Sequence, residues 1–328
     1  MTILNIDNVN SNMEFNFNRV IPETSWLVEN LVPSGHLCFV LAKAGVGKSL
    51  LVESLGIHCV HAVNFAGLKT VEGNVLIVDQ DTPENVLSKR LIKLSSAMEN
   101  KPKHKLYVVK GNYKLSDNTL QTLINDYKDV VLVIVDSFHS VCGKLDPNST
   151  SDMNRLASFK DMCLNQNKTI IFNHHISQKT DITLDELMTG ETGSLAMGNS
   201  AIIQQADSYY IIGATADNGL TNRIYMRPIA KREAIPSKPI IIRLIQTETG
   251  EKLSYDGVYE PELDEDIHHD IVMLFKELNK ERTVKEVYED MGHRHGENSV
   301  RKALAQLDKK GKVIFSKSKA NLFRYRLP

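Results

Sequence analysis

The stretch His36–Ser49, HLCFVLAKAGVGKS, decides the fold, because a short apolar run passes directly into a glycine-rich loop and then into a helical pattern. His36–Ala42 is apolar without alternation, which is typical of a strand buried on both faces of a sheet. Gly45 and Gly47 allow successive backbone N–H groups to turn inward around phosphate oxygens, and the helix N-terminus that follows favours negative charge. The pattern GxxxxGK[ST] is met except that Ala42 replaces the first glycine. These residues predict a phosphate-binding loop.

Individual residues of this loop have separate expected roles. We expect Lys48 to reach the β- and γ-phosphates of ATP and the Ser49 hydroxyl to ligate Mg²⁺. The Mg²⁺ needs a carboxylate at the end of another strand, and Asp136, which closes the run VVLVIVD, meets that need. ATP and Mg²⁺ are therefore the expected cofactors. The nucleotide-binding residues expected from the motif are Ala44, Gly45, Val46, Gly47, Lys48, Ser49 and Leu50.

Apolar runs and helical patterns alternate along most of the chain. The expected strands after the first are Gly73–Asp79, Lys105–Val109, Val130–Asp136 and Thr169–Asn173. The expected helices are Ser49–Val63, Pro83–Met98 and Asp152–Asn165. This alternation predicts an α/β fold with a mainly parallel sheet and right-handed crossovers. After about Ser208, short apolar segments separated by Gly, Asn and Pro predict antiparallel hairpins that extend one edge of the sheet.

Composition excludes several protein classes and reveals a charge split. The chain has 328 residues, enough for about two domains, and a net charge of −1. Residues 291–328 hold ten Lys/Arg against two Asp/Glu, a local charge of +8, so the remainder carries −9. The chain has no apolar run of about 18 residues, which is the length that a transmembrane helix needs, so no membrane partner is expected. The four cysteines follow no ligand spacing, which indicates a reducing, cytoplasmic setting.

The basic C-terminal region predicts a domain of its own. Three helical patterns followed by two alternating apolar segments match the order of a winged helix-turn-helix. The expected organisation is a lead-in at 1–20, an ATPase domain at 21–259, a linker at 260–266 and the winged helix at 267–328. We expect duplex DNA contacts from Asn298, Arg301 and Lys302 on the third helix and from Lys317 and Lys319 in the wing. Protein docking or a merely solvated basic surface are the alternatives.

Four segments together resemble a known family. WLVENLVPSGHLCFVLAKAGVGKS at 26–49, GNVLIVDQDTP at 73–83, VVLVIVDS at 130–137 and FNHHISQK at 172–179 are similar to the RecA-like ATPases of the RepA type. These ring-forming replicative helicases of plasmids and phages are AAA-type P-loop ATPases. The resemblance covers roughly residues 20–250 and implies a RecA-like P-loop NTPase core.

The resemblance also implies site residues near the nucleotide. In the family, a Glu after the second core strand polarises the attacking water, and Asp81 stands at that place, one methylene shorter. Asp79 is the alternative base. The family's polar motif after the strand that follows the Mg²⁺ aspartate matches His174 and His175, with Lys179, and implies a γ-phosphate sensor. A plain loop role stays open for the histidines, and a metal role for them is weak.

Further implied roles involve other subunits and DNA. The family supplies a cation in trans from the end of a late strand, where Lys231 and Arg232 stand here, which implies a closed ring, expected to be a hexamer. The family's polar loops line a channel for single-stranded DNA, with Lys144 and Lys179 as phosphate contacts. A solvated basic turn and simple surface loops are the respective alternatives.

Together these features predict an ATP-dependent, ring-forming DNA motor, most specifically a replicative DNA helicase of a plasmid, phage or mobile element. A DNA-binding ATPase that does not unwind, such as a recombinase, loader or switch, is one alternative. The other is a DNA-binding regulator whose oligomeric state is controlled by ATP. A strand-displacement assay separates the first alternative from the helicase, and a Lys48→Ala variant that keeps its cellular role would favour the second.

Overall fold

The computed structural model describes residues 23–176, 184–189, 200–217, 220–230, 238–259, 265–292, 296–317 and 323–328. The chain divides into two compact units, Met1–Tyr259 and Glu260–Pro328, which we describe separately. Within the described ranges, no helix combines the length and the apolar character needed to cross a membrane. All four cysteines are buried with free thiols.

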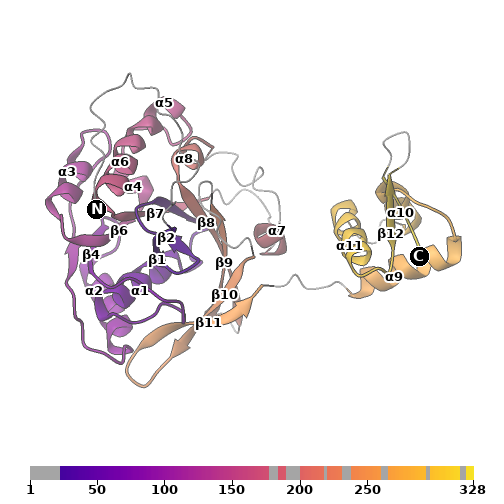
Figure 1. Ribbon diagram of the computed structural model, residues 1–328, viewed down its shortest axis with the longest axis horizontal. Coiled ribbons are helices and arrows are strands. Elements are labelled where there is room, and N and C mark those ends of the chain that lie inside the picture. Colours follow the sequence, from indigo (N-terminus) through magenta and orange to yellow (C-terminus); the bar gives the residue numbers. More distant parts are fainter. Residues whose placement is uncertain are drawn as a thin grey trace. The chain divides into compact units, whose positions relative to one another are not determined.

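A nine-stranded sheet forms the centre of the larger unit, in the order β11-β10-β9-β8-β3-β7-β6-β4-β5 (Figure 1). The strands from β8 to β5 in that order run parallel, and β9, β10 and β11 add antiparallel hairpins at one edge. The bounds are β3 Leu37–Ala42, β4 Asn74–Asp79, β5 Leu106–Val109, β6 Val130–Asp136, β7 Thr169–His175, β8 Ser208–Asp217, β9 Leu220–Ala230, β10 Ile240–Gln246 and β11 Glu251–Val258. The α/β class with a mainly parallel sheet and antiparallel edge hairpins is therefore confirmed.

Helices cover both faces of this sheet (Figure 1), which explains why its central strands are apolar without alternation. One face packs on α1 and α2 and the other on α3, α4 and α6, and each face has its own buried cluster. The helix bounds in this unit are α1 Lys48–His61, α2 Glu84–Ser96, α3 Thr119–Asp126, α4 Phe138–Cys142, α5 Thr150–Met153, the 3₁₀ helix η1 Asn154–Leu156, α6 Ala157–Gln166, α7 Leu184–Thr189 and α8 Ser200–Gln205.

A short ribbon and one aromatic side chain join the start of this unit to the core. The strands β1, Trp26–Val28, and β2, Val32–Pro33, pair antiparallel. Tyr210 is 1% exposed, and its hydroxyl donates a hydrogen bond of 2.9 Å to the Leu31 carbonyl. Residues 23–33 are thereby held against the parallel sheet.

The smaller unit contains three helices followed by a two-stranded hairpin. Its elements are α9 Glu265–Leu278, α10 Val284–Asp290, α11 Glu297–Lys309, β12 Ile314–Lys317 and β13 Phe323–Arg326. The Thr283 hydroxyl oxygen accepts a hydrogen bond from the Glu286 N–H, and the Glu286 carboxylate accepts one from the Thr283 N–H, a capping box that starts α10. Helix α9 begins at Glu265, inside the 260–266 segment that the sequence suggested as a linker. Three helices followed by a hairpin is the element order expected from the sequence for this region, and the winged-helix assignment stays a prediction.

Candidate active site

The loop between β3 and α1 has a backbone that only glycine adopts readily. Gly45 has φ 79° and Gly47 has φ 95°, both in the left-handed region, and Gly47 is the residue just before α1. A Cβ added at Gly47 would also lie 3.2 Å from the Ile224 Cδ1 atom. The loop therefore leads directly into the N-terminus of α1, which is the arrangement that the motif predicts for an anion site.

Lys48 is the first residue of α1 and is only 5% exposed. Its Nζ donates hydrogen bonds to the Ala42 carbonyl at 3.1 Å and the Lys43 carbonyl at 3.0 Å, and lies 3.1 Å from His175 Nδ1. Burial lowers the pKa of Lys48 to about 8, against the opposing charge of Asp136. The ammonium group thus points into the loop, where an anion would meet it.

Asp136 closes β6, two strands away from the loop strand β3. On the adjacent strand β4, Asp79 pairs with Asp136, and on the other side of β6 the strand β7 separates it from β3. Because these strands are parallel, their carboxyl ends meet at one edge of the sheet. Burial raises the pKa of Asp136, while the nearby Ser49 hydroxyl and Asn173 amide oppose that shift. The structure therefore brings Ser49 and Asp136 together, as expected for the two Mg²⁺ residues.

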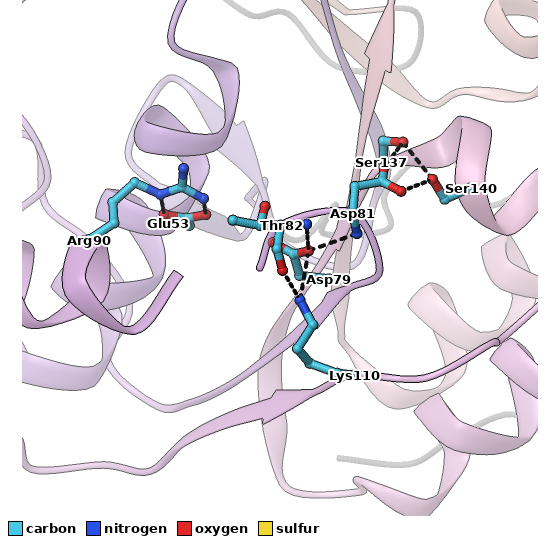
Figure 2. Close-up of polar contacts among 8 residues, drawn as sticks. All are labelled: Glu53, Asp79, Asp81, Thr82, Arg90, Lys110, Ser137 and Ser140. Atoms are coloured by element: carbon cyan, nitrogen blue, oxygen red, sulfur yellow. Dashed lines mark hydrogen bonds and ion pairs between the residues drawn. The ribbon is translucent and has the colours of Figure 1, made fainter. Parts of the chain in front are cut away.

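Asp79 and Asp81 lie two residues apart but are held very differently (Figure 2). Asp79 is fully buried, and its Oδ1 accepts hydrogen bonds from the backbone N–H groups of Asp81 at 3.0 Å and Thr82 at 2.8 Å. Lys110 forms an ion pair of 3.4 Å with the same oxygen. Asp79 therefore closes the turn after β4. Asp81 is exposed, and its carboxylate accepts hydrogen bonds from the hydroxyls of Ser137 and Ser140.

An ion pair between a buried glutamate and a partly exposed arginine beside these carboxylates was not anticipated from the sequence. Glu53 on α1 is 1% exposed, and both its carboxylate oxygens accept hydrogen bonds from the Arg90 guanidinium on α2 (Figure 2). Burial raises the pKa of Glu53 to about 7, although Arg90 opposes the rise. The one available signal was that Glu53 follows Ser49 by four positions, which places both on one face of α1.

Three carboxylates in this site suit a hard divalent cation. Oxygen atoms of Glu53, Asp79 and Asp136 lie within 4.8 Å of one another. The Oδ2 atoms of Asp79 and Asp136 are buried, and neither has a hydrogen-bond partner in the part of the chain that the structure describes. Buried carboxylate oxygens that lack a donor are natural ligands for Mg²⁺. The residues present therefore fit the cation that the sequence predicts.

The two adjacent histidines point to different environments because neighbouring strand residues face opposite sides. His175 lies beside Lys48, and burial followed by the charge of Lys48 lowers the pKa of His175. The neutral ring accepts the Lys48 hydrogen bond through Nδ1, since an ammonium can only donate. His174 is 6% exposed, and its ring packs edge-on against Phe138 with centroids 5.3 Å apart. The structure brings His175 to the site and buries His174 in the core.

The remaining predicted site residues lie elsewhere. Lys179, Lys231, Arg232 and Lys319 are outside the described residues. Lys144 is exposed in the segment that follows α4. In the smaller unit, Arg301 forms an ion pair of 3.2 Å with Glu297 on α11, which also carries Asn298 and Lys302, and Lys317 ends β12. The structure therefore assembles the predicted nucleotide residues but leaves the predicted DNA and subunit contacts as predictions.

A family model described as an AAA domain matches residues 8–181, just over half of the chain. Among curated proteins, none matches the sequence. The matched range includes the glycine loop, Asp81, Asp136 and both histidines.

Proposed function

We propose, on the premise that the chain belongs to the AAA domain family, that it is an ATP-driven, ring-forming DNA motor and most specifically a DNA helicase of the replicative type. The family consists of nucleotide-dependent P-loop ATPases, which bind ATP, typically with Mg²⁺. The observation that carries the proposal is the convergence of Lys48, Asp81, Asp136 and His175 at the carboxyl ends of neighbouring parallel strands.

The residues of the site have separate roles in ATP hydrolysis. Lys48 exchanges its two carbonyl hydrogen bonds for phosphate oxygens, which is favourable because an ammonium bonds an anion more strongly than a neutral carbonyl. Ser49 and Asp136 would hold a Mg²⁺ ion, which would neutralise charge on the β- and γ-phosphates. His175 lies next to Lys48, so it reports whether the γ-phosphate is present.

Asp81 is the base in this proposal. It takes a proton from the water whose oxygen attacks the γ-phosphorus, while the bond from that phosphorus to the leaving oxygen of ADP breaks. Asp79 does not fit this role, because it is fully buried and already bonded to the turn. Asp81 has an exposed carboxylate that water can reach.

In the proposal, the ring supplies a further cation to the γ-phosphate, in addition to Lys48 of the same subunit. In the proposal, Lys231 or Arg232 reaches the γ-phosphate of the neighbouring subunit and stabilises the charge that develops there. Arg232→Ala should then keep ATP binding and lose ATP turnover. Arg243→Ala is the matched control, because Arg243 is an exposed arginine on β10 that pairs with Asp256 at 2.7 Å. Normal turnover in Arg232→Ala would exclude Arg232 as the trans residue.

DNA contact is divided between the two units. Lys144 and Lys179 contact single-stranded DNA in the channel of the ring, and Asn298, Arg301, Lys302, Lys317 and Lys319 contact duplex DNA. The charge distribution supports this division, because residues 291–328 carry +8 while the rest of the chain carries −9. Basic side chains on the smaller unit would supply most of the salt-dependent affinity.

A strand-displacement assay tests the motor function. The full-length protein with ATP and Mg²⁺ should separate a forked duplex, and Lys48→Ala should not. Hydrolysis of ATP that is stimulated by DNA but accompanied by no strand displacement would overturn the helicase assignment and favour a non-unwinding ATPase such as a loader or switch.

A further inference from the structure

Both carboxylate oxygens of Asp81 are engaged by serine hydroxyls (Figure 2). Ser137 Oγ donates to Asp81 Oδ2 at 2.7 Å, and Ser140 Oγ donates to Asp81 Oδ1. The two hydroxyls lie 3.2 Å from each other. This arrangement was not predicted, because Ser137 and Ser140 follow the Mg²⁺ aspartate by one and four residues and lie more than fifty positions from Asp81 along the chain.

Both serines belong to a segment that buried side chains and hydrogen bonds hold in place. Ser137 is 4% exposed and directly precedes α4, whose Phe138 and Val141 are fully buried. The Leu115 N–H donates to the Val141 carbonyl at 2.9 Å, which ties α4 to the segment after β5. The Lys114 ammonium adds a second tie by donating to the Ser140 carbonyl. The positions of both hydroxyls are therefore set by the core of the unit.

The serine hydroxyls are not needed to close the turn that carries Asp81. That turn is already closed by Asp79 Oδ1, which accepts the N–H groups of Asp81 and Thr82. Gln80 secures it further, since its N–H donates to the Asp136 carbonyl at 3.1 Å and its side chain donates to the Tyr113 carbonyl at 2.7 Å. The hydroxyl bonds therefore act on the Asp81 side chain and leave the backbone conformation to other groups.

We propose that Ser137 and Ser140 are positioning residues that hold the Asp81 carboxylate in the orientation needed to receive a proton from the attacking water. An exposed aspartate otherwise samples several rotamers, and its side chain reaches less far than a glutamate. A carboxylate has about four acceptor positions, so two hydroxyl bonds leave room for the water. The inference rests on the proposed role of Asp81 in ATP hydrolysis.

Removal of the Ser140 hydroxyl tests this directly in the full-length protein. Ser140→Ala should lower kcat for ATP by about tenfold to a hundredfold, the effect of misplacing a reacting group by about 1 Å. The KM for ATP should stay near the wild-type value, because Lys48 and the glycine loop are unchanged. Ser140→Thr keeps the hydroxyl and should retain most of the activity. Ser158→Ala is the matched control, since this helical serine bonds Gln121 at 3.3 Å outside the site.

Repeating the Ser140→Ala substitution in the Asp81→Asn variant distinguishes failure of the positioning role from failure of the role proposed for Asp81. In Asp81→Asn, single-turnover hydrolysis should be nearly abolished, and adding Ser140→Ala should cause no further loss. An equal loss from Ser140→Ala in both backgrounds would show that Ser140 acts elsewhere. Normal kcat in the Ser137→Ala/Ser140→Ala double variant, with Asp81→Asn inactive, would overturn the positioning role alone. Wild-type turnover in Asp81→Asn would overturn both the role of Asp81 and the inference.

Discussion

Replacing Arg90 with methionine should destabilise the larger unit, and more so at pH 8 than at pH 5.5. Arg90 supplies two hydrogen bonds and a positive charge to Glu53, which is 1% exposed and lies beside Asp79 and Asp136. Removing one partner of a buried ion pair leaves the other charge uncompensated, at a cost of roughly 3–5 kcal/mol. Because Glu53 can take up a proton instead, we expect a loss of about 3 kcal/mol at pH 8.

The pH dependence follows from the pKa of Glu53. Burial raises this pKa from 4.5 to about 7, so the folded protein binds a proton that the unfolded chain releases between those values. The free energy of unfolding therefore falls as pH rises through that window. Arg90 holds the pKa of Glu53 down, so it rises above 7 in Arg90→Met and the fall continues toward pH 8. At about 1.4 kcal/mol per pH unit, the variant should lose about 1.4 kcal/mol more at pH 8 than at pH 5.5.

Urea unfolding followed by tryptophan fluorescence measures this loss, because the single tryptophan, Trp26, lies in the larger unit. EDTA and the absence of nucleotide keep ligand binding out of the comparison. The control is Glu53→Gln/Arg90→Met, which has no buried charge at this position and should recover most of the lost stability. A loss below about 1 kcal/mol at pH 8, or equal losses at both pH values, would refute the reasoning.

Three further predictions concern binding and packing. Lys48→Ala should abolish binding of a fluorescent ATP analogue while leaving urea unfolding unchanged, and retained binding would contradict the role of the loop. Gly250→Ala should cost about 1–3 kcal/mol in the same unfolding assay, because its Cβ would lie 2.0 Å from the Lys93 carbonyl oxygen. Deleting residues 260–328 should weaken binding to duplex DNA and reduce its dependence on salt concentration. An unchanged salt slope in the deletion variant would place the duplex contacts in the larger unit.

The sequence predicted the central strands well because they are buried on both faces. The run Val130–Asp136 coincides with β6 residue for residue, and the expected strand Gly73–Asp79 differs from β4 by one residue. A strand covered on both sides has a continuous apolar pattern that few other structures share. Helix α1 was placed nearly correctly for a related reason, since the glycine loop marks its start.

Helices α3 and α4 were missed because their signals are weak. Helix α3 spans Thr119–Asp126 and has eight residues, of which three, Leu120, Leu123 and Ile124, are apolar, so its helical pattern extends over little more than two turns. Helix α4 has five residues, Phe138–Cys142, which is shorter than a helical period pattern needs. Its position nevertheless matters, because it brings Ser140 to Asp81.

Contacts between distant elements account for what the sequence could not predict about the site. A glutamate and an arginine on two helices usually face solvent, and only the packing of α1 against α2 buries Glu53 and pairs it with Arg90. Likewise, the sequence presented His174 and His175 as equivalent sensor candidates. The register of β7 against β3 places His175 beside Lys48, whereas the His174 ring packs against Phe138.

Particle mass and symmetry test most directly whether the protein forms an ATP-dependent ring that acts on DNA. The measurement uses the full-length protein with single-stranded DNA and a non-hydrolysable ATP analogue, and compares it with Lys48→Ala under the same conditions. We predict a closed ring of six subunits for the wild-type protein and its absence for Lys48→Ala. A wild-type protein that stays monomeric with both ligands bound would contradict the ring, the cation in trans and the channel together.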